Sequence, residues 1–545
     1  MSDLSRRSAI KFSSFGLASV VAASAPEAFG QSLPQDRSVA GVFDVRAYGA
    51  IGDGKTVDTP AINRAIEAAS AVGGGTVAFP AGVYLSFSIR LRSHIQLQLH
   101  AGAVILAADS PLPEQSTGYH GGSYDAAEAK TAWDAYQDFG HNHWHNSLIW
   151  GEELENCSIV GSGLIWGRGL SHGRGRHTLG YRFVAEQAGV GNKAIALKNC
   201  RNVILRDFSI LKGGHFGLLL TGVDNLTIDN LTIDTDRDGM DIDCCRNVRV
   251  SNCVVNSPWD DGICPKSSFA LGYARPTENV TITNCYVTGT YQLGTVLDGT
   301  FKKFSDGNSD VSSNYTGRIK CGTESNGGFR NITISNCVFE CCQGLALETV
   351  DGALLEDISI SNITMRDVTT CPLFFRLGAR LRGPKETTKV GTLRRVLVNN
   401  LVSYNTASRL SSILSGIPGY QIEDIKISNM YVQHVGGAST ESLAIRPPEL
   451  ENNYPEPGMF GAMPAQGFYI RHTKHLEMSH VDVEPFANDP RPVFFLDHVD
   501  RADFLAVTSP KGQPAFQLEQ VSDFRVVSSR AAADTTLMSA DSRSL

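Results

Sequence analysis

The feature that most constrains the fold is a short pattern of apolar and polar residues that recurs along the middle of the chain. Each copy alternates apolar residues, continues with an Asn or a similar turn residue, and ends in a second short apolar strand. The first two steps between copies are 23 and 22 residues long. Copies begin at Asn202, Asn225, Asn247, Asn279 and Asn331, with weaker ones at Asp357, Asp424 and His475.

Short strands with polar corners at this period predict a parallel β-helix, in which successive coils stack about 4.8 Å apart. A leucine-rich repeat is the alternative for such a period. Its Leu and Asn signature is missing here, and so are the helical segments that it requires. We therefore expect an all-β fold, a single-stranded parallel β-helix.

A helix is expected to cover the open end of the first coil. Thr59 stands where a helix cap belongs, and Pro60 follows at the first helical position. The Gly-rich segment 73–75 ends the helix. Its apolar face consists of Ala61, Ile62, Ala65, Ile66 and Ala69.

The first 30 residues resemble a twin-arginine export signal. Arg6 and Arg7 precede an apolar, Ser- and Gly-diluted stretch at 12–23, and a small-x-small cleavage site follows at 28–30. An ordinary cytoplasmic N-terminus that happens to contain two Arg is the alternative. Because no later stretch is apolar enough to span a bilayer, we expect a periplasmic or secreted protein without membrane contact after signal removal.

Cysteine content and net charge agree with this route. Twin-arginine substrates fold before export in a reducing cytoplasm, so the 12 Cys are not expected to form a disulfide framework. Five of them recur at one place in the repeat and are expected to stack as small apolar residues: Cys157, Cys200, Cys253, Cys285 and Cys337. The net charge of −8 argues against nucleic acid as a partner.

Residues 41–545 are expected to form one β-helix domain with several insertions. Loops on one flank of a solenoid often wall a binding cleft. The insertions are expected near 109–146, 171–192, 298–317 and 436–466, the last with five Pro.

The first insertion contains two groups of residues that need an explanation. Its aromatic residues either stack on sugar rings or cover the core. His141, His143 and His145 have no acidic or Cys partner in register, which favours a polar loop over a metal site. The aromatic residues are Tyr119, Tyr124, Trp133, Tyr136, Phe139 and Trp144. We expect neither a metal nor a cofactor.

Carboxylates collect in one region. Asp238 and Asp260 are 22 residues apart, which is one coil, and Asp261 follows directly. Equivalent places on successive coils are about 5 Å apart, so these three should cluster. Like charges at that distance raise the pKa of at least one member, and carboxyls of unequal pKa supply the acid and base of glycosidic hydrolysis. A calcium site or a solvated acidic corner is the alternative.

At this point the chain resembles glycoside hydrolase family 28, the polygalacturonase family, whose fold is a right-handed parallel β-helix. Segment 52–84 is similar to the start of pectin-active β-helices. The family motif Asn-Thr-Asp-Gly-x-Asp is matched in part by 236–241, Gly-Asp-Asp-x-Ile-x-x-Lys-Ser by 259–267, and Arg-Ile-Lys by 318–320. The Gly-His-Gly motif has no His counterpart, because Gly289-Thr-Tyr-Gln-Leu-Gly stands in its place.

The resemblance implies roles for individual residues. Asp260 would be the general acid, while Asp238 and Asp261 would hold and deprotonate water, with inversion at the anomeric carbon. Arg318 and Lys320 would bind a substrate carboxylate. Three further candidates for substrate contact are His215, which is equally well explained as a packed structural residue, Lys266 and Glu348.

The function expected from these residues is hydrolysis of a uronate-containing, pectin-type polysaccharide or oligosaccharide. Insertions that close a cleft into a pocket favour exo-action, the release of sugars from a chain end. Two alternatives remain: a polysaccharide lyase that binds calcium at the Asp cluster, and a non-catalytic, carbohydrate-binding β-helix such as an adhesin.

Overall fold

The computed structural model describes residues 41–545 except 113–114, 119, 139, 172–186, 290–293, 301–314 and 408. Residues 40–545 form one compact unit. The expected export signal at 1–30 lies outside the described residues, as do Tyr119 and Phe139. Within the described part, no helix is long and apolar enough to cross a membrane.

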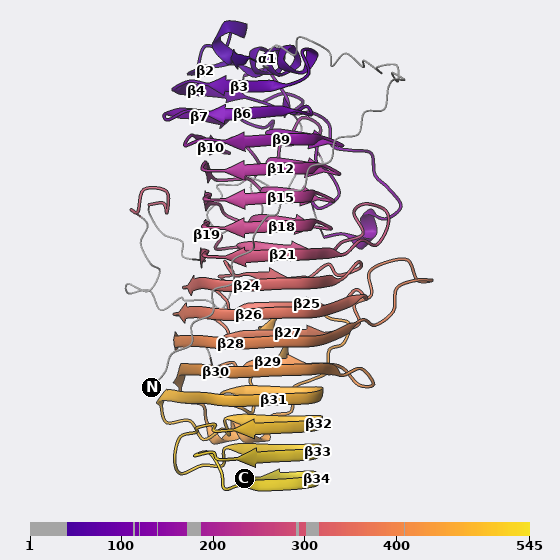
Figure 1. The fold of residues 1–545 in the computed structure, drawn as a ribbon, viewed down its shortest axis with the longest axis vertical. Coiled ribbons are helices and arrows are strands. Elements are labelled where there is room, and N and C mark those ends of the chain that lie inside the picture. Colours follow the sequence, from indigo (N-terminus) through magenta and orange to yellow (C-terminus); the bar gives the residue numbers. More distant parts are fainter. Residues whose placement is uncertain are drawn as a thin grey trace, which may run out of the picture. The chain divides into compact units, whose positions relative to one another are not determined.

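Strands that pair in parallel, each with the strand one coil earlier, build almost the whole unit (Figure 1). The N-terminal coils of the large sheet contain β1 (Val42–Asp44), β2 (Asp53–Val57), β3 (Gly75–Phe79), β4 (Gly82–Ser86), β6 (Ile95–Leu99), β7 (Ala103–Ala107), β9 (Glu155–Val160), β10 (Leu164–Trp166), β12 (Arg201–Arg206), β13 (Ser209–Leu211), β15 (Asp224–Asp229), β16 (Thr232–Asp234), β18 (Arg246–Ser251), β19 (Val254–Asn256), β21 (Thr277–Thr283) and β22 (Tyr286–Thr288).

A second face of the same coils is a smaller parallel sheet, and the C-terminal coils follow both. The smaller sheet contains β5 (Ile89–Arg90), β8 (Ile149–Glu152), β11 (Lys193–Lys198), β14 (Phe216–Thr221), β17 (Asp238–Asp243) and β20 (Ile263–Lys266). The C-terminal coils contain β23 (Lys320–Cys321), β24 (Phe329–Glu340), β25 (Leu345–Thr349), β26 (Leu354–Arg366), β27 (Leu373–Leu377), β28 (Thr392–Thr406), β29 (Ser412–Ser415), β30 (Ile422–Gly436), β31 (Phe468–Ala487), β32 (Phe494–Leu505), β33 (Phe516–Val527) and β34 (Thr535–Ser544).

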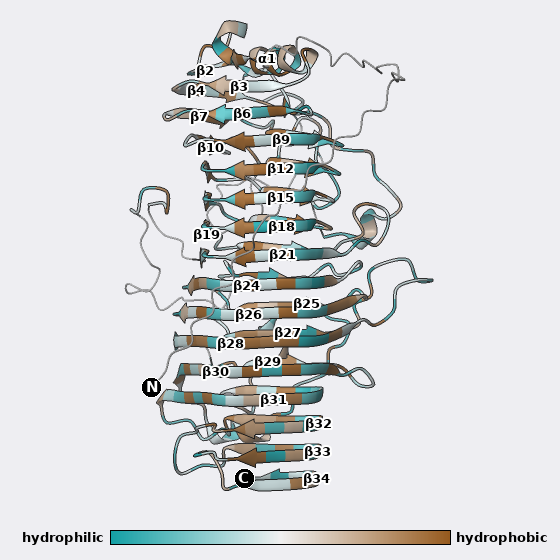
Figure 2. Ribbon diagram, in the orientation of Figure 1, coloured by the Kyte–Doolittle hydropathy of each residue, from teal (hydrophilic) through white to brown (hydrophobic). Residues whose placement is uncertain are grey.

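Equivalent residues of successive sequence repeats lie opposite each other in the stack. Val203 on β12 lies opposite Leu226 on β15, which lies opposite Val248 on β18. In Figure 2 the apolar segments of β9, β12 and β15 lie one above another. The predicted parallel β-helix is confirmed.

The cysteines pack as the repeat predicts. Cys253, Cys285 and Cys337 are each 1% exposed and follow one another along the stack. All twelve cysteines fall in the described ranges, and every one is buried and free of a disulfide. The core is therefore held by packing, without covalent cross-links among these residues.

Asparagines hold the corners of the coils. One column of them has φ between 54° and 57°, the left-handed region that Asn tolerates better than most residues. From the second member onward, each side-chain amide in the column donates to the side-chain oxygen of the Asn one coil earlier, at 2.9 to 3.1 Å. The column consists of Asn156, Asn202, Asn225, Asn247, Asn279 and Asn331.

The ends of the stack are covered differently. The helix α1 (Thr59–Ala71) lies beyond the first coils (Figure 1), and its predicted apolar face is buried. The prediction that Thr59 caps it is wrong, because the cap position is Asp58 and Thr59 is already helical. The Asp58 carboxylate accepts hydrogen bonds from the N–H groups of Ile51 and Gly52 instead. At the other end, β34 pairs antiparallel with β33.

The expected insertions fall between consecutive strands. Residues 109–146 lie between β7 and β8 and contain only the 3-10 turn η2 (Asp134–Tyr136) among their described residues. Residues 436–466 lie between β30 and β31, with η3 (Thr440–Ala444) and η4 (Pro457–Phe460). The expected insertions at 171–192 and 298–317 lie largely outside the described residues.

The corner asparagines predict a measurable stability effect. Asn400 has φ 57° and donates to Asn362 at 3.1 Å. Asn400→Ala is expected to lower the free energy of unfolding by about 1–2 kcal/mol, because Ala tolerates a left-handed backbone less well than Asn and cannot make the amide hydrogen bond. Asn400→Gly loses the same hydrogen bond without the backbone strain and should cost less. Urea unfolding measures both variants; equal losses in the Ala and Gly variants would contradict the strain argument.

Candidate active site

The three predicted aspartates meet where β17 and β20 lie side by side. Asp238 begins β17, and Asp260 and Asp261 directly precede β20. The main chain joins the two segments, since Gly239 N–H donates to the Asp261 carbonyl oxygen at 2.9 Å. One carboxylate oxygen from each of the three side chains lies within 4.8 Å of the others. The one-coil spacing therefore brings the carboxylates together.

The three carboxylates have different partners. Asp261 is fully buried; its Oδ1 accepts from Arg318 Nε at 2.9 Å and its Oδ2 pairs with Lys320 Nζ. The Asp260 side chain is 24% exposed and pairs with Arg237. Asp238 is 3% exposed. Asp260 is thus the member of the trio with the most exposed side chain.

These partners separate the protonation states of the carboxylates. Burial alone would raise the pKa of Asp261, but Lys320, Arg318 and Lys266 outweigh it and lower the pKa to about 2. Burial, together with the charges of Asp241 and Asp260, raises the pKa of Asp238 well above its usual range. The pKa values of two neighbouring carboxyls are therefore shifted in opposite directions, which favours the ionised form of Asp261 and the protonated form of Asp238.

The basic pair of the Arg-Ile-Lys segment faces the protein's own carboxylates. Arg318 Nη2 donates to Glu456 Oε1 at 2.7 Å and lies 3.8 Å from Glu348 Oε1. Lys320 pairs with Asp261, and its Nζ lies 5.9 Å from the centre of the Tyr454 ring. Tyr454 and Glu456 both come from the insertion between β30 and β31.

A second ionic cluster adjoins Asp238. His141 Nε2 lies 3.1 Å from Asp241 Oδ2, and His141 Nδ1 lies 2.8 Å from Glu324 Oε1. Lys266 Nζ lies 3.5 Å from Glu324 Oε2. Burial would lower the pKa of His141, but Glu324 and Asp241 raise it to about 10, so the imidazole carries a positive charge at neutral pH.

Sequence analysis did not assign His141, Asp241 or Glu324 to the site. In the sequence, His141 lies in an insertion that has no acidic partner in register. Its partners come from β17 and from the segment after β23, 100 and 183 positions further along the chain. No repeat spacing links an insertion to particular coils, so the sequence offered no signal for these contacts.

The five predicted substrate-binding residues lie in the interior. His215 packs edge-on against Phe216 at 4.3 Å between ring centres, and burial with the Arg237 charge holds its pKa well below the usual range. Glu348 on β25 accepts no hydrogen bond from the described residues. None of the five exceeds 4% exposure: His215, Lys266, Arg318, Lys320 and Glu348.

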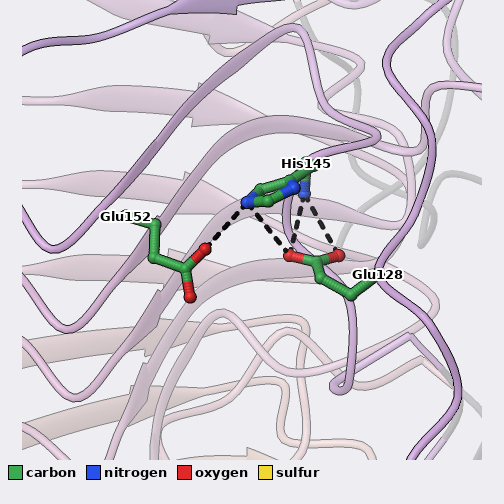
Figure 3. Close-up of side chains that lie close together, drawn as sticks. All are labelled: Glu128, His145 and Glu152. Carbon is green, nitrogen blue, oxygen red and sulfur yellow. Dashed lines mark hydrogen bonds and ion pairs between the residues drawn. The ribbon is translucent and has the colours of Figure 1, made fainter.

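His145 belongs to a separate group at the start of β8 (Figure 3). Its Nε2 lies 2.9 Å from Glu152 Oε2 and 3.5 Å from Glu128 Oε1. Glu128 also accepts the main-chain N–H groups of Trp144 and His145. His145 thereby ties the 109–146 insertion, to which Glu128 also belongs, to Glu152 on β8. In the same insertion Tyr124 and Trp144 are buried, so their rings pack within the protein.

Among the residues that the structure describes, three groups of side chains have donor atoms close enough for a metal ion, but protein cations or N–H groups already contact each of them. Asp261 is held by Lys320 and Arg318, which repel a divalent cation. Lys266 lies 4.0 Å from Asp241. Lys198 lies 2.9 Å from Glu152. The groups are Asp238–Asp260–Asp261, His141–Asp238–Asp241 and Glu128–His145–Glu152.

Comparison with known proteins agrees with this geometry. Residues 42–131 match the family described as rhamnogalacturonase A/epimerase, pectate lyase-like, and residues 151–271 match the right-handed β-helix region. A protein of Vitis vinifera described as a probable polygalacturonase is 23% identical over 415 residues, which is 71% of this chain and 73% of that protein.

Two solved structures share the fold. An exopolygalacturonase from Thermotoga maritima has a TM-score of 0.55 at 18% identity, covering 81% of this chain and 91% of that one. The family 28 exopolygalacturonase of Yersinia enterocolitica has a TM-score of 0.59 at 17% identity, covering 86% and 79%. The predicted right-handed β-helix is confirmed, and the resemblance to the polygalacturonase family is supported by these relatives.

Glu348 gives the site a pH-dependent stability. Burial raises its pKa to about 7, although Lys320 and Arg318 oppose this. A carboxyl with a raised native pKa stabilises the fold below its unfolded pKa and loses that contribution as pH rises through about 7. Glu348→Gln removes the titrating group. Between pH 5 and pH 8, its free energy of unfolding should therefore fall less than that of the native chain.

Urea unfolding at the two pH values measures this, with the exposed Glu386→Gln as the control. A variant whose stability falls between pH 5 and pH 8 as steeply as that of the native chain would show that Glu348 does not titrate in this range.

Proposed function

We propose that this protein is a glycoside hydrolase that cleaves a uronate-containing, pectin-type polysaccharide or oligosaccharide. The observation that carries the proposal is the carboxylate trio, in which the pKa of Asp261 is lowered to about 2, the pKa of Asp238 is raised, and one oxygen from each member lies within 4.8 Å of the others. Acid and base of unequal pKa are what hydrolysis of a glycosidic bond requires. The polygalacturonase relatives support the choice of substrate.

The roles follow from exposure and partners. Asp260, the most exposed of the three, is the general acid that protonates the leaving oxygen. Asp261, kept anionic by Arg318 and Lys320, holds and deprotonates the attacking water. Asp238 completes the water site.

The short distances between the carboxylate oxygens do not by themselves indicate inversion at the anomeric carbon. Inverting pairs are typically about 6.5–9.5 Å apart, whereas retaining pairs are about 5 Å apart, and the oxygens here lie within 4.8 Å. Two of the three carboxylates are nevertheless poor nucleophiles. Asp261 has both oxygens bound by cations, and Asp238 is buried with a raised pKa. Water is left as the nucleophile, which inverts the anomeric carbon.

Exo-action is supported by the origin of the residues around the trio. The 109–146 insertion delivers His141 beside Asp238 and Asp241, and the insertion between β30 and β31 delivers Tyr454 and Glu456 beside Lys320 and Arg318. Two insertions that contact different sides of the charged cluster narrow the access to the carboxylates, and a narrow site favours chain ends over mid-chain sugars.

The role of Asp260 is tested by Asp260→Asn. Turnover should fall at least about 100-fold while the fold is unchanged, because a general acid contributes about 10²–10⁴. Reducing ends released from pectic oligosaccharides measure the rate. Asp229→Asn, on a strand of the large sheet, is the control. A near-native rate in Asp260→Asn would remove Asp260 from this role.

The products test the mechanism. Hydrolysis should continue in EDTA, show no ultraviolet absorbance from a double bond, and release mono- or disaccharides first, with the inverted anomer in proton NMR of the fresh product. Absorbance with a calcium requirement would identify a lyase. A retained anomer would mean that a carboxylate attacks, and a fast loss of polymer viscosity would show endo-cleavage.

A further inference from the structure

The Arg318 guanidinium is hydrogen-bonded at two of its three nitrogen atoms, whereas Nη1 has no hydrogen bond among the described residues. Nε donates to Asp261, and Nη2 donates to Glu456 at 2.7 Å and lies near Glu348. The side chain is 0% exposed. Of its three acidic partners, Asp261 and Glu348 are buried and come from the coils, whereas the Glu456 side chain is 34% exposed and comes from an insertion.

The segment that carries Glu456 is anchored on both sides of it. Two residues earlier, the Tyr454 hydroxyl accepts a hydrogen bond from Thr323 Oγ1 at 2.9 Å. Four residues later, Phe460 is buried, with the guanidinium groups of Arg376 and Arg471 over its ring at 5.3 and 5.5 Å. Glu456 itself directly precedes η4. These contacts place the Glu456 carboxylate against Arg318.

The charges around Arg318 and Lys320 leave no positive excess. The two cations face three carboxyl groups, those of Asp261, Glu348 and Glu456. With Glu348 protonated below about pH 7, cations and anions balance. A uronate brought to this place would meet Glu456 as a like charge and would have to displace it to bond with Arg318 Nη2.

We propose that Glu456 occupies the position of a substrate carboxylate, so that the subsite beside Arg318 accepts an uncharged sugar residue: a neutral sugar or an esterified uronate. This rests on the proposed function and narrows it, because pectin-type polymers contain both charged and uncharged residues. It replaces the expectation that Arg318 binds a substrate carboxylate, and the two hypotheses predict opposite effects of removing Glu456.

Binding tests the proposal without requiring turnover. Trigalacturonate and its methyl-esterified form are titrated calorimetrically into Asp260→Asn protein, with and without Glu456→Ala. Removing Glu456 frees one charge-assisted donor of Arg318, so the affinity for the free acid relative to the ester should rise about 10-fold or more. Glu456→Gln, which keeps the shape and an acceptor oxygen, should shift the ratio in the same direction by less. Glu441→Gln, in the same insertion, should leave it unchanged.

The outcomes separate this inference from the proposed function. An unchanged ratio in both Glu456 variants, a loss of free-acid affinity on Glu456→Ala, or no binding of either probe overturns the inference. The same ratios are then measured as kcat/KM in the presence of Asp260. A shifted binding ratio in a protein that cleaves no pectic substrate would overturn the proposed function and leave the inference standing.

Discussion

The stacking of one coil on the next at a fixed register is the constraint on which the rest of the structure depends. The corner asparagines accept a left-handed backbone and hydrogen-bond to the same corner one coil earlier. Because successive corners are stacked, residues that are one coil apart in the sequence lie next to each other on adjacent coils. Asp238 and the Asp260–Asp261 pair meet for this reason, although each lies on its own coil.

Bringing anions together in the interior is unfavourable unless cations accompany them. Here the cations come from neighbouring coils: Lys266 lies on β20, Lys320 lies on β23, and Arg318 lies just before β23. Their placement divides the protons, because Asp261 receives two cations while Asp238 faces Asp241 and Asp260. The difference in pKa between Asp261 and Asp238 thus depends on which segments carry the basic residues.

The periodic part of this molecule could be predicted from the sequence, and the aperiodic part could not. The repeat fixed the coils, the Cys stack and the neighbourhood of the aspartates, because each depends on spacing alone. His141 and Glu456 reach the site from insertions, where the period is broken and spacing carries no information. Thr59 was misplaced for a local reason: Asp58 precedes it and has its own main-chain partners.

The two ends of the coil stack have a consequence for how copies of this chain behave toward each other. A parallel stack of strands presents an unpaired edge at each end, and such edges join with those of other molecules. The helix α1 covers one end, and the reversed strand β34 is laid against the other. A further strand would have to pair with β34, which carries the charged residues Asp541 and Arg543, and charged side chains on an edge strand discourage edge-to-edge growth.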